Sequence, residues 1–194
     1  MNTAELRFFQ LAEQIAGAAV QAATAYNQCQ AQLNLEAILT PGRLCTQEGT
    51  RESLGVIGEL ERLTREHKAM FANFTLRATQ QLLAALAELP MDRQEAARQG
   101  LAESVNRNMA AQSAFYQDRE TWIKHARALC HLIDENRARI AFQGDTLLFQ
   151  ADEPLVEFNR LVECLDNIHA REVTRYRERQ ARIMKSVQAI KGES

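Results

Sequence analysis

Large apolar side chains recur every three or four positions along most of this chain, which is the spacing of amphipathic helices. The clearest case is the segment 92–142, which contains no proline and only one glycine. Large residues recur there at multiples of seven positions: Leu101, Phe115, Trp122 and Leu129. Such spacing is typical of long helices that pack as in coiled coils. The pattern therefore predicts a long amphipathic helix over 92–142.

Start and stop signals divide the rest of the chain into three further helices. Asp92 and Glu95 have the spacing of a capping box at a helix start. Pro41 and Pro90 each end a preceding helix, because proline disfavours helical backbone at the residue before it. Gly144 marks the turn after the third helix. We therefore expect helices over about 3–39, 51–89, 92–142 and 153–191.

Four long helices joined by mostly short connections predict an all-α fold. We expect a single domain over residues 1–194, built as an antiparallel up-down four-helix bundle with coiled-coil-like packing. The composition agrees: 46% hydrophobic and 25% charged residues are ordinary for a globular chain. A low aromatic content of 6% favours helices over sheet.

The first predicted helix has an unusual middle, because no residue from Gln14 to Leu35 is charged. Its amide side chains are too many for a membrane span. Two interpretations remain open: a helix covered on most sides within one chain, or a helix whose outer face packs on a second copy. Small residues let helix backbones approach closely, so we favour a homodimer. One face of this helix is expected to contain Leu11, Ile15, Ala18, Ala22, Ala25 and Cys29.

The segment 42–58 holds four of the eight glycines of the chain, with apolar residues between them. This composition predicts a structured joint, in which the second helix begins loosely near Thr50. As the only glycine-rich apolar segment, it is a candidate loop for docking a partner protein, and a plain connector is the alternative. The candidate docking residues are Leu44, Leu54, Val56 and Ile57.

Two histidines are the metal candidates of the sequence. If the third and fourth helices fold about a turn near Leu147, His125 and His169 each lie 22 residues from it. Cys130 and Cys164 lie five residues from these histidines, about 140° around a helix, so they point in other directions. A contact between the two histidines stays open. The alternative that we favour is a pair of partly buried histidines bonded to polar groups of the bundle.

No motif of a common catalytic or cofactor site is present. The chain lacks a phosphate-binding loop, a nucleophile elbow and a haem-attachment motif. We therefore expect no cofactor and no enzymatic activity. The chain also lacks a secretory signal and a run of apolar residues that could span a membrane, so we expect a cytoplasmic protein.

The last predicted helix becomes basic towards its end. Arg171, Arg175 and Arg182 can line one side of it, as a contact for an acidic partner, nucleic acid or anionic lipid. The alternative is a set of cations near a helix C-terminus with local ion pairs. The net charge of −2 and a single interleaved aromatic residue, Tyr176, argue against nucleic acid. Contact with a membrane surface stays open.

Three hypotheses for function follow, in order of preference. The first is a non-enzymatic protein-interaction module that acts as a helical-bundle dimer: an adaptor, a chaperone or an assembly component. The second is a ligand- or metal-sensing helical bundle in which His67, His125 and His169 line a site. The third is an amphipathic coat protein on lipid or storage granules.

Overall fold

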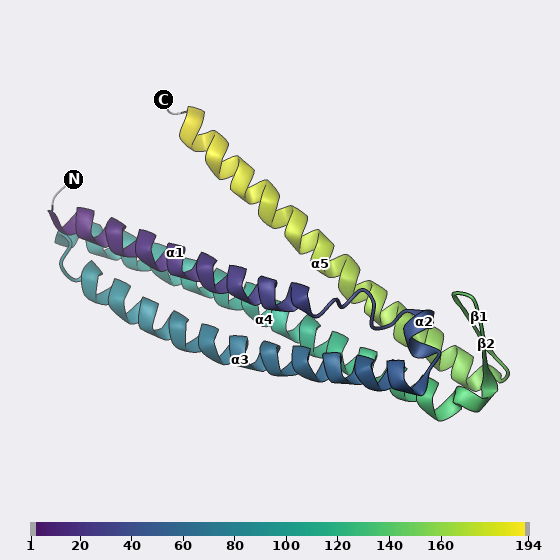
Figure 1. Cartoon of the computed structure of the whole chain (residues 1–194). Helices are drawn as coiled ribbons and strands as arrows, with labels where there is room; N and C mark the ends of the chain where they lie inside the picture. The colour runs from purple at the N-terminus through teal and green to yellow at the C-terminus, as the bar shows by residue number, and fades with distance from the viewer. Residues whose placement is uncertain (1–2, 193–194) are drawn as a thin grey trace. The chain divides into compact units, whose positions relative to one another are not determined.

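Long helices make up most of the computed structural model, as Figure 1 shows. The structure describes the backbone of residues 3–192, and the side chains of residues 3–178 and of residue 181. The prediction of an all-α fold is confirmed at this level, with one small antiparallel sheet in addition. The elements in chain order are α1 (Thr3–Gln32), α2 (Pro41–Leu44), α3 (Gln47–Leu86), α4 (Met91–Asn136), the 3-10 turn η1 (Arg137–Arg139), β1 (Ile140–Gln143), β2 (Thr146–Phe149) and α5 (Asp152–Gly192).

The first predicted helix was too long at its C-terminal end. α1 ends at Gln32, and Asn34 then adopts a positive φ of 48°, a left-handed conformation that ends helices. The second predicted helix corresponds to α3, which starts at Gln47, earlier than the expected position 51. The Thr46 hydroxyl accepts a hydrogen bond from the Gly49 backbone N–H at 2.9 Å, so a threonine cap fixes the start of α3 at Gln47.

The third predicted helix also extended too far, because the chain forms a hairpin where continued helix was expected. α4 ends at Asn136, and β1 pairs with β2 in the register Ile140 to Phe149. A two-residue connection with Gly144 at φ 58° joins the strands, and glycine tolerates this backbone conformation without steric cost. The start of α5 at Asp152 lies one residue from its predicted position.

The chain divides into two compact units, and α3 and α4 contribute to both. Unit 1 comprises Met1–Ile38 and Gly55–Glu120; unit 2 comprises Leu39–Leu54 and Thr121–Ser194. Whether both fold as one domain over residues 1–194 stays a prediction. No helix of the described chain is both long enough and apolar enough to cross a membrane.

Unit 1 contains α1, most of α3 and most of α4. A short connection joins α3 to α4, and the Gln94 side-chain amide donates to the Leu89 carbonyl oxygen within it at 2.8 Å. Such a short connection favours antiparallel packing of α3 and α4. The buried apolar residues of the unit are Tyr26, Ile38, Ile57, Leu60, Ala78, Leu86, Leu89 and Tyr116.

Unit 2 has its core along the C-terminal part of α4 and the first half of α5. The hairpin turns one face inwards, and the ring of Phe149 lies 5.2 Å from that of Phe158 on α5. The opposite face of the hairpin, with Leu148, is exposed. The buried apolar residues of the unit are Leu44, Ile123, Ala126, Leu129, Cys130, Ile133, Ile140, Leu161, Leu165 and Ile168.

Candidate functional site

A cluster of aromatic rings attaches α1 to its neighbours in unit 1. Tyr26 is the one buried side chain of α1 among the described residues. Its ring lies 4.3 Å from the His67 ring on α3 and 5.8 Å from the Phe115 ring on α4. Its hydroxyl lies 3.4 Å from the buried Thr64 hydroxyl. The one fully buried side chain of α1 among the described residues therefore lies near one end of a helix of 30 residues.

His67 lies between two tyrosines. The Tyr116 hydroxyl is 2.9 Å from His67 Nδ1, and it donates to this nitrogen when the proton of the neutral ring is on Nε2. Burial lowers the pKa of His67, and burial together with the nearby Tyr26 raises the pKa of Tyr116 to about 12. Lys68 lies 5.9 Å above the Tyr116 ring and pairs with Glu120 at 2.6 Å. The cluster is thus built around a neutral histidine.

We expect this histidine to make unit 1 less stable in mild acid. The pKa of His67 is lower in the folded protein than in the unfolded chain, so the unfolded chain binds a proton first as the pH falls. The contribution of His67 to the free energy of unfolding is therefore complete above the pKa of the unfolded chain, about 6.5. It decreases as the pH falls from there through the lower pKa of the folded protein. Thermal unfolding followed by circular dichroism between about pH 8 and pH 5 measures this loss.

Replacement of His67 by glutamine is the control, because glutamine can accept the Tyr116 bond but does not titrate. His125 also has a lowered pKa and contributes in the same direction, so H67Q should reduce the pH dependence without abolishing it. An identical pH dependence in H67Q would show that the cluster does not sense pH.

The remainder of α1 is poorly covered. From Thr3 to Ala25 no side chain is buried, although most residues there are apolar, small or amide-bearing. A half-buried row runs along the side of Tyr26: Phe8, Leu11, Ile15, Ala19 and Ala22. Half of the face predicted from the sequence lies in this row, namely Leu11, Ile15 and Ala22, whereas its other members Ala18, Ala25 and Cys29 are exposed.

The exposed side of α1 carries large apolar residues. Phe9 is 59% exposed and Val20 is 62% exposed, and Leu6 is also exposed. The first part of α4 likewise has no buried side chain from Met91 to Phe115. These parts of unit 1 therefore present surface where a self-sufficient bundle would have a core.

The predicted docking segment 42–58 is helical, so the prediction of a loop was wrong. It consists of α2, a short connection and the first turns of α3. Leu44 and Ile57 are fully buried, which leaves neither side chain accessible to a partner. Leu54 and Val56 are partly exposed, and a docking role for these two residues stays a prediction.

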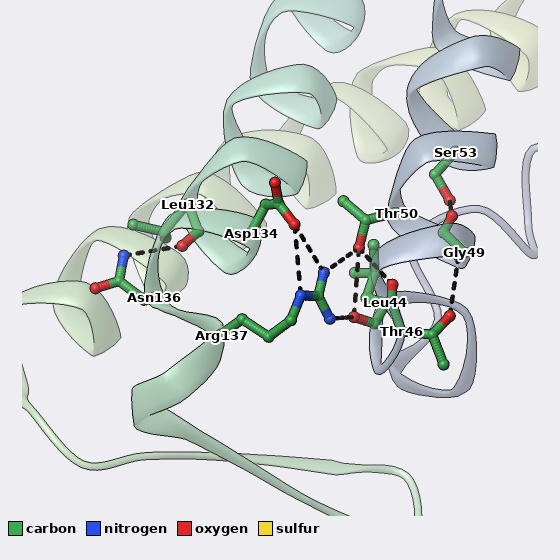
Figure 2. A network of polar contacts seen from close by, with 9 residues as sticks. All are labelled: Leu44, Thr46, Gly49, Thr50, Ser53, Leu132, Asp134, Asn136 and Arg137. Atoms are coloured by element: carbon green, nitrogen blue, oxygen red, sulfur yellow. Dashed lines mark hydrogen bonds and ion pairs between the residues drawn. The ribbon is translucent and has the colours of Figure 1, made fainter.

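A hydrogen-bond network in unit 2 holds this segment in place (Figure 2). The Arg137 guanidinium donates to the Leu44 carbonyl oxygen at 2.9 Å and to the Thr50 hydroxyl at 2.6 Å. It also bonds to the Asp134 carboxylate at 3.2 Å. Gly49 fits beneath the Arg43 carbonyl, because a Cβ added there would lie 1.9 Å from that oxygen. The segment is thus a tightly packed joint between α2 and α3.

The histidines singled out as metal candidates lie in different environments. His125 is half-buried, and burial, Arg160 and Lys124 lower its pKa, whereas His169 is exposed. Among the described residues, no group of three or more His, Cys, Asp and Glu side chains is placed to hold a metal ion. Cys130 is buried, which raises the pKa of its thiol to about 11.

Two of the three basic residues singled out on α5 lie close to each other. Arg171 and Arg175 border one shallow depression on α5 with Asn167 and Thr174. Both arginines also interact with other groups of the protein. The side chain of Arg182 lies outside the described residues. A role of these arginines in partner binding stays a prediction.

No protein-family model, no curated protein and no solved structure matches this chain.

Proposed function

We propose that this protein is a non-enzymatic protein-interaction module, acting as a homodimer of helical bundles in the cytoplasm: an adaptor, a chaperone or an assembly component. The observation that supports it most is α1, whose described residues bury one side chain along 30 positions. Most helices gain their stability by packing an apolar face. A second protein surface that packs on α1 in the functional dimer would explain why a helix of this length has only one buried side chain among its described residues.

The proposal includes the architecture expected from the sequence. α1, α3, α4 and α5 are its four long helices, arranged as an antiparallel up-down bundle with coiled-coil-like packing. The short α3–α4 connection supports the antiparallel part of this arrangement.

Exposed apolar side chains on α3 and α4 support binding of further proteins. Methionine is prominent among them: Met70, Met91 and Met109 are all exposed. Methionine is flexible and polarisable, so it suits surfaces that adapt to a partner. The exposed large apolar residues of unit 1 are Leu6, Phe9, Val20, Met70, Leu76, Leu83, Met91 and Met109.

Native mass spectrometry on gently purified protein tests the proposal. The expected species has twice the chain mass of 21.9 kDa and no additional mass. A monomer at micromolar concentration would contradict the homodimer. Additional mass in the size range of a metal ion or small molecule would favour the sensing hypothesis over the interaction module.

A further inference from the structure

The exposed side of α1 carries a regular row of residues. The members of this row, which we call the outer row, are Phe9, Glu13, Ala16, Val20, Thr24, Asn27 and Ala31. All are exposed, and each is separated from the next by three or four positions. Phe9, Val20 and Ala31 lie 11 residues apart, which is close to three turns of a straight helix. The outer row therefore stays on one side of α1, on a different side from the half-buried row.

The outer row has the same spacings in both chain directions. Counted from Val20, its members lie 4, 7 and 11 positions away towards either end. Two α1 helices that cross antiparallel at Val20 would thus bring their outer rows together position by position. The large Phe9 would meet the small Ala31 of the second copy, and Ala16 would meet Thr24. Large residues opposite small ones fill a helix interface well.

The charge in the outer row also favours antiparallel packing of two α1 helices. Glu13 is the one charged member of the outer row, and no residue from Gln14 to Leu35 is charged. In the antiparallel register Glu13 meets Asn27 of the second copy, an amide that can donate to its carboxylate. In a parallel register the two Glu13 carboxylates would face each other and repel.

From these observations we infer that α1 of a second copy packs antiparallel on the outer row, with Val20 on the twofold axis. The inference rests on the proposed homodimer and assigns its interface, which uses the same patch on both copies. Gly17 adjoins the row near the axis, and a Cβ added there would meet nothing within 4 Å. Glycine and Ala16 at this place let the two backbones approach closely.

Replacement of Val20 by glutamate tests the assignment. It places two like charges together on the axis, so the dissociation constant of the dimer should rise at least about 100-fold. The matched control is Val156→Glu on α5, where the valine is 67% exposed against 62% for Val20. The control should leave the constant unchanged. Sedimentation velocity over a concentration series measures both variants, and circular dichroism checks that their helices remain.

The outcomes separate the interface from the proposed function. A monomeric wild type would overturn both. A dimeric wild type with equal constants for both variants would overturn the outer-row interface and leave the homodimer in place. A monomer in which a thiol introduced by Val20→Cys reacts slowly with a maleimide would show that another part of the same chain covers the row.

Cross-linking tests the direction of packing without a disruptive charge. In a Cys29→Ser background, which removes an exposed thiol of α1, Val20→Cys should join two copies through a short bifunctional thiol reagent. Ala31→Cys should not join them, because its counterpart lies at the far end of the antiparallel pair. Equal cross-linking at both positions would contradict the antiparallel register.

Discussion

Replacing Gly49 by alanine is expected to lower the free energy of unfolding by about 3 kcal/mol. The added Cβ would lie 1.9 Å from the Arg43 carbonyl oxygen and 3.0 Å from the Thr46 hydroxyl. The first of these neighbours is backbone, so relief requires α2 and the first turn of α3 to move apart. That movement would also disturb the bond from the Gly49 N–H to Thr46, which caps α3. Urea unfolding followed by circular dichroism gives the change directly.

Gly58→Ala is the matched control, because Gly58 lies in the same helix and its added Cβ would meet nothing within 4 Å. Alanine should stabilise α3 there by about 0.5–1 kcal/mol, since glycine loses more conformational freedom on folding. The same substitution should thus act with opposite sign at two positions of α3. Destabilisation of similar size at both positions would show that the close contact at Gly49 does not matter.

The two glycines also show where sequence reasoning failed. Glycine-rich composition over 42–58 predicted a structured joint in which the helix begins loosely near Thr50, yet Gly49 is required by a close backbone contact and Gly58 lies inside a regular helix. Local pattern cannot distinguish these cases, because the partner of Gly49 is fixed by how α2 folds back on α3. The threonine cap at Thr46 was the signal that would have placed the helix start correctly.

Features with strong local signals were predicted well. Asp152 and Pro154 marked the start of α5 to within one residue, because acids and proline favour the first turn whatever the tertiary context. The hairpin after α4 was missed, since four-residue strands are too short to separate from a continuing helix by periodicity. Gly144 was recognised as a turn, and the apolar residues that alternate on either side of it were the additional signal.

The cluster of Tyr26 with His67 and Phe115 lay beyond the reach of the sequence. The sequence named His67 only as a candidate to line a site, because its neighbours Tyr26 and Tyr116 come from positions more than 40 residues away. The uncharged middle of α1 was recognised, whereas its inward face was predicted only in part, because small residues encircle the helix and give periodicity little contrast. The contact at Tyr26 fixes the rotation of α1, and the outer row follows from it.

Replacing Arg137 by alanine is expected to cost about 2 kcal/mol of stability. The side chain donates to the Leu44 carbonyl oxygen and to the Thr50 hydroxyl, and Thr50 is 1% exposed (Figure 2). Hydrogen bonds from a charged donor to buried acceptors are worth more than exposed ones. The pair with Asp134 adds little, because that carboxylate is partly exposed. The loss should therefore persist at high salt.

Two controls identify the bonds responsible. Arg139 lies in the same 3-10 turn with an exposed side chain, so Arg139→Ala should change stability by less than about 0.5 kcal/mol. Thr50→Val removes the hydroxyl that Arg137 reaches, so the effects of Thr50→Val and Arg137→Ala should not add in the double variant. Simple additivity would show that Arg137 does not act through the Thr50 hydroxyl. Non-additivity would show that Arg137 joins the end of α4 to the α2–α3 joint through Thr50, a bond between residues 87 positions apart in the chain.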